Sequence, residues 1–232
     1  MKYKIILSLV VLFLLVSCDS SITRRFKQAK RLSKTGNMEK WEEAIREFDE
    51  IIKIQVNARE YQALIYRKLG KRHMEMEHWN DSLENYKKAA EILPNEGYLH
   101  YRIGVCYSQL SRSEKDEEKK MSLIQEAEKE YHLAISLNDK LIDPYYGLGI
   151  INFYVYKNYN KGMEYMAEVL RRDSKNIDAH FALARFYYEI GESRHSLEFY
   201  KALLSLVPEN DQRYPQVNEN IQRIQAELRG SK

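Results

Sequence analysis

The strongest constraint on the fold of this chain is a residue pattern that occurs twice. The first copy consists of Gly70, Ser82, Tyr86, Ala89 and Pro94, which are separated by 12, 4, 3 and 5 residues. The second copy lies 114 residues later and keeps the same intervals in Ala184, Ser196, Tyr200, Leu203 and Pro208. Two antiparallel helices interlock only where small side chains on one helix admit bulky side chains from the other. The pattern therefore predicts an array of repeated helical hairpins.

Composition agrees with a helical chain and excludes several other classes. Of the 232 residues, 44% are hydrophobic, and only 9 are Gly and 4 are Pro. These values exclude a disordered or collagen-like chain and argue against a turn-rich all-β fold. The 37 Lys and Arg residues nearly balance the 34 Asp and Glu residues, which leaves a net charge of +3. Neutralising phosphates favours a strong basic excess, so no nucleic-acid partner is predicted.

The segments from Tyr66 to His73 and from Ser82 to Pro94 resemble the tetratricopeptide repeat (TPR), a helix-turn-helix unit of about 34 residues. The same columns of small and large residues can be followed along most of the chain. The resemblance implies an all-α fold, a right-handed α-solenoid of five TPR units with a C-terminal capping helix. The units are assigned to residues 22–58, 63–96, 97–141, 142–176 and 177–210, and the capping helix to residues 211–232.

Several departures from the regular repeat bear on the structure. Residues 59–62 separate the first unit from the second, and the fourth unit contains one extra residue. The third unit has eleven extra residues within 108–124, whose mixed charges are typical of a solvated extension of the hairpin; a docking role is the alternative. In the capping helix an apolar face is predicted to cover the last repeat. That face consists of Val217, Ile221, Ile224 and Leu228.

The N-terminus resembles the signal sequence of bacterial lipoproteins. Lys2 and Lys4 precede 12 almost wholly apolar residues, 5–16, a run shorter than the ~20 residues that a membrane-spanning helix needs. Residues 15–18 read LVSC, which resembles the lipobox. The resemblance implies a signal peptide over residues 1–17, cleavage before Cys18, acylation of the Cys18 thiol and a lipidated tether over residues 18–21. An ordinary signal peptide with a chance cysteine is the alternative.

Lipidation implies a location in a bacterial cell envelope, attached to a membrane, with the inner and the outer membrane both open. It also leaves Cys106 as the remaining thiol, so the mature chain is predicted to form no internal disulfide. Cys106 lies in an apolar stretch and is interpreted as a small buried residue rather than a reactive thiol.

Sequence motifs typical of catalysis or metal binding do not occur in the chain. It contains no HExxH motif, and His100 and His180 occupy one repeat column, which favours packing over metal ligation. His73 and His78 are five residues apart, about 500° around a helix, so their rings are expected to splay. Gly147 and Gly149 lack the third glycine of a dinucleotide-binding loop and follow no strand. We therefore predict no enzyme activity, no cofactor and no metal.

In TPR proteins generally, the first helices of successive units line a concave groove that binds an extended peptide or a partner's helix. In the third to fifth units the matching positions form an aromatic stripe, composed of Tyr98, Tyr101, Arg102, Tyr146, Ile150, Phe153, Tyr154, Phe181, Arg185 and Tyr188. Such a stripe is often core, but the core columns are already filled by Tyr145, Leu148, Gly149 and their equivalents. The stripe is therefore a candidate partner-binding surface, because Tyr and Arg often anchor interfaces.

In the first two units the matching positions are basic, and we call Lys27, Lys30, Lys34, Arg67, Lys68 and Lys71 the basic face. Some chaperone-binding TPR proteins hold a terminal carboxylate with Lys and Asn at such positions, but no Asn stands here. A rival interpretation starts from the short tether, which reaches at most ~13 Å and keeps the first helix near the bilayer. There each basic residue gains ~1 kcal/mol from anionic headgroups. A solvated helix face is the third interpretation.

These features predict a membrane-anchored scaffold that binds a protein or peptide partner through its concave groove. The alternative is an accessory subunit that binds an apolar or aromatic small ligand in transport or envelope assembly. Self-association also stays open, because an exposed aromatic stripe serves a second copy of the chain as well as another partner.

Overall fold

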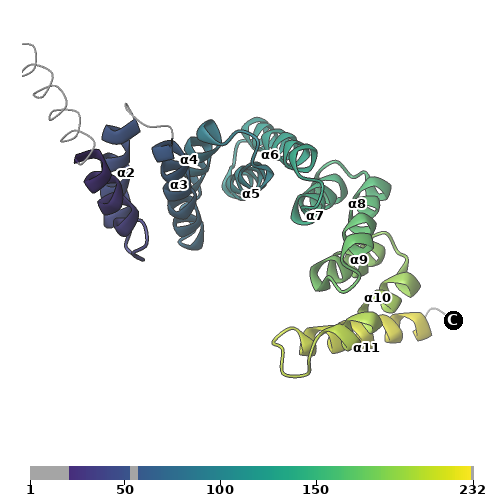
Figure 1. Ribbon diagram of the computed structural model, residues 1–232. Coiled ribbons are helices and arrows are strands. Elements are labelled where there is room, and N and C mark those ends of the chain that lie inside the picture. Colours follow the sequence, from purple (N-terminus) through teal and green to yellow (C-terminus); the bar gives the residue numbers. More distant parts are fainter. Residues whose placement is uncertain (1–20, 53–56, 231–232) are drawn as a thin grey trace, which may run out of the picture. The chain divides into compact units, whose positions relative to one another are not determined.

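The computed structural model describes residues 21–52 and 57–230, and Figure 1 shows the helices along the chain. Within these ranges every regular element is a helix and no strand occurs, so the all-α prediction is confirmed. The predicted signal peptide, Cys18 and the tether up to residue 20 lie outside the described residues. No helix in the described ranges combines the length and the apolar content that spanning a membrane requires.

The chain divides into two compact modules, one up to Leu110 and one from Ser111 onward. The N-terminal module contains the helix of residues 21–32, α2 (Met38–Ile52), α3 (Asn57–Glu75), α4 (Trp79–Ile92) and most of α5 (Gly97–Ser113). The C-terminal module contains α6 (Glu117–Leu137), α7 (Asp143–Ile150), the π-helix η1 (Ile151–Val155), α8 (Tyr159–Arg172), α9 (Ile177–Glu189), α10 (Ser193–Leu206) and α11 (Tyr214–Gly230).

The small and large residues of the repeat pattern meet where α3 packs against α4. A Cβ atom on Gly70 would lie 2.9 Å from the fully buried ring of Tyr86, so a larger residue would clash there. Ser82 Oγ donates a hydrogen bond of 2.8 Å to the Gly70 carbonyl oxygen. In the C-terminal module Ser196 Oγ donates in the same way to the Ala184 carbonyl oxygen, at 2.7 Å. Both copies of the sequence pattern therefore build the same contact between paired helices.

The predicted second unit contains α4 and the part of α3 from residue 63 onward, and the fifth contains α9 and α10. Residues 59–62 were expected to separate the first two units, and this expectation was wrong because they belong to α3, which begins at Asn57. The physical reason is burial on the early turns of this helix. Ala58 is completely buried, and Gln62 is buried and donates a side-chain hydrogen bond to Asp49 of α2.

The eleven extra residues of the third unit lengthen its two helices. α5 runs to Ser113, α6 begins at Glu117 and has 21 residues, and only residues 114–116 separate them. Asp116 caps α6, because its carboxylate accepts a 2.9 Å hydrogen bond from the Lys119 main-chain N–H. Residues 115–119 are exposed, as expected for a solvated extension.

The one extra residue of the fourth unit coincides with a π-helix. η1 continues α7 without a break, and a π-helical turn accommodates one more residue than the α-helix does. Buried Asn152 stabilises this turn, since its side-chain amide donates 2.9 Å to the Leu148 carbonyl oxygen. The change in helical register turns Phe153 toward α8, where a Cβ atom on Gly162 would lie 2.8 Å from Phe153 Cβ.

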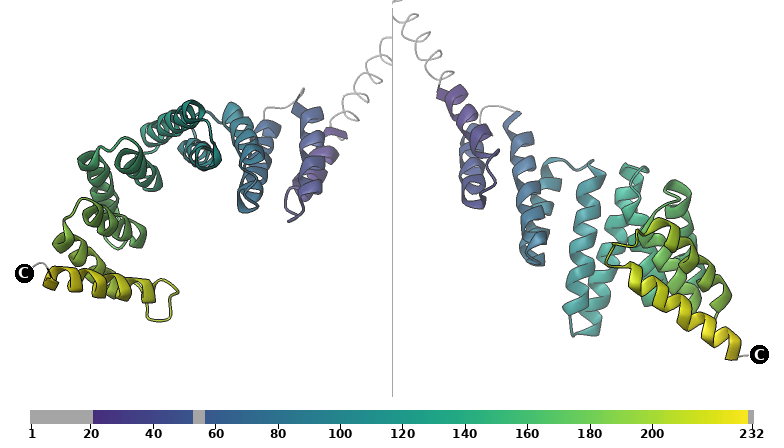
Figure 2. Two further views of the ribbon diagram at one scale, coloured as in Figure 1. Left: turned by 180° about the vertical axis from the view of Figure 1, so that it is seen from behind. Right: turned by 90° about the horizontal axis from the view of Figure 1, so that it is seen from below.

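The last helix, α11, covers the apolar side of α10, and Figure 2 shows it in yellow beside the preceding helices of this module. Val217, Ile221 and Ile224 are buried in a core that they share with Tyr200 and Leu203, and Leu228 packs against it. Gly230 is the last helical residue. The predicted apolar face of the capping helix is therefore the face that packs on α10.

Candidate binding surfaces

In the C-terminal module, a hollow of about 260 Å³ lies between the α7–η1 segment, α9 and the start of α11. Five residues of the predicted aromatic stripe line it, namely Tyr146, Ile150, Tyr154, Phe181 and Arg185. The remaining lining residues are Asp178, Ala182, Phe186, Arg213 and Gln216. We call this hollow the aromatic pocket.

Contacts between aromatic rings beneath the aromatic pocket hold the side chains of its floor in place. The Phe186 ring stacks on Phe153 with a centroid distance of 3.7 Å and an angle of 5° between the planes. Tyr154 meets the edge of Phe186 at 5.5 Å, and its hydroxyl donates a 3.0 Å hydrogen bond to Glu189. The Arg185 guanidinium lies 5.8 Å from the centre of the Tyr154 ring. These side chains are therefore ordered by contacts within the module.

Burial and neighbouring charges keep the pocket's tyrosines neutral. Burial raises the pKa of Tyr154 to about 12, and the hydrogen bond to the Glu189 carboxylate contributes to this increase. Burial also raises the pKa of Tyr146, with a smaller increase from Asp178 that Arg185 opposes. Both phenols are consequently protonated near neutral pH, and the proton of the Tyr154 hydroxyl is already donated to Glu189.

Arg213 lies at the rim of the aromatic pocket, where it contacts two carboxylates. Arg213 donates two hydrogen bonds to Asp211, of 3.0 Å and 2.7 Å, which hold the pKa of that carboxyl down at about 2. Arg213 also lies 3.8 Å from Asp178, whose side chain is 74% exposed, while that of Arg185 is 63% exposed. The rim thus presents both charges to solvent around an aromatic floor.

Two stripe residues of the C-terminal module lie outside the aromatic pocket. The placement of Phe153 in an open groove was wrong, because the π-helix buries this ring to 1% exposure between α8 and Phe186. Tyr188 does not line the pocket, since its hydroxyl donates 2.9 Å to Glu227 of α11 and Arg223 lies 5.0 Å above its ring. The C-terminal helix occupies the position where Tyr188 was expected to meet a partner.

In the N-terminal module, three residues of the basic face line a second hollow, of about 370 Å³, together with Tyr98. Arg67 forms an ion pair of 2.8 Å with Glu96, while Lys68 donates 2.6 Å to the Ser33 carbonyl oxygen. Lys71 lies 3.9 Å from Glu75 on the same helix. Each of these cations is thus held by a local contact, and the hollow is positively charged.

The other members of the basic face and of the stripe in this module lie outside that hollow. Lys27 and Lys34 are exposed, and Lys30 lies 5.2 Å over the Tyr61 ring. The Arg102 guanidinium sits over both Tyr98 and Tyr101, at 4.9 Å and 5.0 Å. Arg102 Nε also donates 2.8 Å to the Tyr98 hydroxyl, so these side chains form one cation–π cluster.

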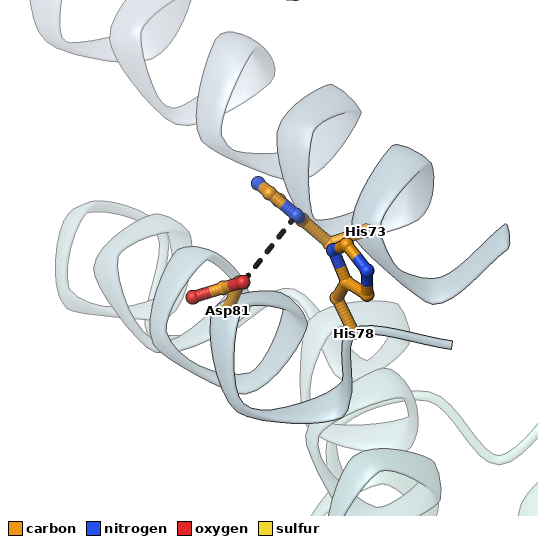
Figure 3. A group of neighbouring side chains, drawn as sticks. All are labelled: His73, His78 and Asp81. Atoms are coloured by element: carbon orange, nitrogen blue, oxygen red, sulfur yellow. Dashed lines mark ion pairs between the residues drawn. The ribbon is translucent and has the colours of Figure 1, made fainter. Parts of the chain in front are cut away.

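Four of the six histidines are either buried or lie close to another histidine. His100 and His180 are both buried and hydrogen-bond to main-chain carbonyl oxygens at 2.9 Å and 2.8 Å, as packing residues do. The expectation that His73 and His78 splay was wrong, because α3 ends at Glu75 and helical geometry does not connect them. Their ring centroids are 6.1 Å apart, and Figure 3 shows both beside Asp81.

Sequence reasoning did not select Arg213 and Gln216 for the aromatic pocket. Both lie after the last repeat, so they have no equivalent positions in the other units from which their location could be predicted. Asp178 stands at a groove position of the fifth unit, and it lines the pocket from the first turn of α9 as that position predicts. The packing of α11 against α10 brings Arg213 and Gln216 to these residues.

No protein-family model matches this chain. Solved structures do resemble it. The TPR protein TTC0263 of Thermus thermophilus aligns over 88% of this chain and 99% of its own, at 15% identity and a TM-score of 0.58. A MamA structure aligns over 72% and 88%, at 23% identity and 0.54. YrrB, a TPR protein with an unusual peptide-binding site, aligns over 80% and 86%, at 17% identity and 0.55. This chain therefore has the fold of the tetratricopeptide-repeat proteins.

Proposed function

We propose that this protein is a membrane-anchored TPR scaffold, and that the aromatic pocket receives an apolar or aromatic side chain of a protein or peptide partner. The observation that carries the proposal is the convergence of five stripe residues, from α7, η1 and α9, on one hollow. Tyr and Arg dominate the anchoring contacts of protein interfaces. A partner side chain that enters the pocket would meet Tyr146, Tyr154 and Phe181 together.

The size and rigidity of the pocket favour a partner's side chain over an enclosed small ligand. Its volume of about 260 Å³ lies below the ~300–1,000 Å³ of sites that enclose small molecules. The stacked pair Phe153 and Phe186 orders the floor before binding, so little side-chain entropy is lost when a partner docks. Exposed Asp178 and Arg185 at the rim offer an acceptor and donors for the partner's main chain.

A solved structure with a similar fold supports the proposal that this fold can bind a peptide. YrrB is a TPR protein with a peptide-binding site, so helix pairs of this kind can present a surface for a peptide. The pocket of the present chain supplies Tyr146, Tyr154 and Phe181, aromatic side chains of the kind that anchor protein interfaces.

Membrane attachment is the second part of the proposal and rests on the N-terminal sequence. Acylation of Cys18 would hold the mature chain to a membrane of a bacterial envelope. The basic face supports this arrangement, because exposed Lys27 and Lys34 follow closely after the lipid-bearing end and favour anionic headgroups. Labelling with radioactive palmitate tests it: the label should disappear in Cys18→Ala, and its persistence would refute lipidation at Cys18.

The pocket is tested by crosslinking in native membranes, followed by affinity purification through the C-terminus. The double variant Tyr146→Ala/Phe181→Ala should lose a partner that the wild-type chain captures. Tyr165→Ala is the matched control, because it removes an aromatic ring on α8 that does not line the pocket. Circular dichroism is used to check that both variants keep the helical content of the wild-type chain.

The outcomes separate the candidate functions. Recovery of the same partners with the double variant would refute the pocket as the contact surface. A small molecule that copurifies with the wild-type chain, detected by native mass spectrometry and absent from the double variant, would replace the partner scaffold by the ligand-binding alternative. Capture of a second copy of the chain alone would identify self-association.

A further inference from the structure

A cluster of metal-ligand residues lies at the turn between α3 and α4, outside both surfaces described above. His73 comes from the last turns of α3, His78 stands directly before α4, and Asp81 lies in the first turn of α4. One ligand atom from each side chain lies within 4.8 Å of the other two. The dashed line in Figure 3 joins His73 Nδ1 to Asp81 Oδ2, which are 3.8 Å apart.

The main chain of the turn holds the two imidazoles side by side. Glu77 adopts a positive φ of 58°, which is uncommon for a residue other than glycine and reverses the chain direction sharply after α3. The His78 N–H then donates a 2.9 Å hydrogen bond to the His73 carbonyl oxygen. The backbone of the turn thus places residue His78 next to His73.

An independent observation at His73 supports a ligand-binding role. Its Nδ1 atom is buried and has no hydrogen-bond partner among the described residues, because the nearest Asp81 oxygen, at 3.8 Å, is beyond hydrogen-bonding distance. The whole His73 side chain is only 16% exposed. Buried polar atoms in folded proteins are almost always paired, and leaving one unpaired destabilises the protein. A cation bound to Nδ1 would pair this atom.

We propose that His73, His78 and Asp81 form a binding site for a divalent transition-metal ion of the zinc type. Imidazole nitrogen and carboxylate oxygen are ligands that Zn²⁺ prefers, and three protein ligands leave the fourth tetrahedral position for water. Metal–ligand bonds of about 2.0–2.1 Å place ligand atoms roughly 3.3 Å apart in a tetrahedral site. His78 and Asp81 are exposed, so small rotations of their side chains close the remaining gap.

The proposed ion would link the end of α3 to the start of α4, which form the helix pair with the clearest repeat pattern. Its ligands come together only when this turn is folded. Binding should therefore stabilise the N-terminal module in proportion to the logarithm of free metal concentration.

The test uses the full chain, purified in detergent without a histidine tag and stripped of metal with a chelator. Co²⁺ is the probe, because its visible absorption reports tetrahedral ligation, and Zn²⁺ is then added as competitor. The wild-type chain should bind one Co²⁺ ion, release it to Zn²⁺, and melt at a higher temperature with Zn²⁺ present.

Variants locate the site. His78→Ala and Asp81→Asn replace exposed ligands and should weaken Zn²⁺ binding at least about ten-fold, since even the loss of an outer-shell partner costs about that much. His195→Ala is the matched control: His195 lies 3.3 Å from Glu192 but belongs to no group of three potential ligands in the described chain, so its loss should change nothing. Absence of Co²⁺ binding by the wild-type chain, or equal affinity in His78→Ala and wild type, would overturn the proposal.

Discussion

Replacing Gly162 by alanine tests the close packing of α8 against η1. A Cβ atom there would lie 2.8 Å from Phe153 Cβ, 3.0 Å from the Phe153 main-chain nitrogen and 3.1 Å from the Gly149 carbonyl oxygen. Two of these three are main-chain atoms, which can retreat only if the helices separate. Overpacking costs about 1–3 kcal/mol, and the main-chain contacts place this site near the upper end. Alanine is about 1 kcal/mol more favourable than glycine inside a helix. The expected net decrease in the free energy of unfolding is therefore about 2 kcal/mol.

This loss should lower the melting temperature by about 4–8 °C for a chain of this size, measured by far-UV circular dichroism. Gly230→Ala is the matched control, since Gly230 is also helical but a Cβ atom there has no neighbour within 4 Å. Its melting temperature should stay the same or rise slightly, because only helix propensity changes. If Gly162→Ala melts at or above the wild-type temperature, the reasoning from close helix approach is wrong.

Three further predictions concern the Ser196 hydrogen bond, the contact between Tyr154 and Glu189, and the Cys106 thiol. Ser196→Ala removes a buried hydrogen bond between α9 and α10 and should cost about 1 kcal/mol in urea unfolding. Glu189→Gln removes the carboxylate that the Tyr154 hydroxyl contacts, so the Tyr154 pKa, followed by NMR, should fall below about 12; an unchanged value would leave burial as its sole cause. Burial raises the pKa of the Cys106 thiol to about 11 from 9.0, so its contribution to stability is full below pH 9 and declines as pH rises toward 11. In a Cys18→Ala background, Cys106 should react with a thiol reagent only after unfolding, and rapid reaction in the native protein would contradict its burial.

The helical hairpins could be predicted because their contacts repeat at short, regular distances along the sequence. Gly70 and Ser82 are 12 residues apart, and the hydrogen bond between them follows directly from the helix-turn-helix spacing. Tyr86 then fills the space that Gly70 leaves open. Helix packing requires a small residue opposite a large one. This requirement is local, so the pattern can be recognised in a single sequence.

The aromatic pocket could be predicted only in part. Tyr146, Phe181 and Arg185 were found because they lie in corresponding repeat columns. Phe153 was misplaced because the extra residue was absorbed by a π-helix, which rotates the helix face that follows it. Arg213 was missed because the terminal segment belongs to no repeat. Matching equivalent positions between repeats therefore misplaces residues wherever the helical register changes, and it cannot be applied beyond the last repeat.

The sequence by itself determined the all-α class, the pairing of helices and the apolar face of α11, because these depend on periodicities of a few residues. Only the tertiary structure decided which side chains meet at the turns between helices and at the terminal helix. His73 and His78 were expected to diverge along one helix, yet α3 ends between them and Glu77 turns the chain back. These side chains meet Asp81 because the chain turns tightly between α3 and α4, and a turn of that kind leaves no periodic mark on the sequence.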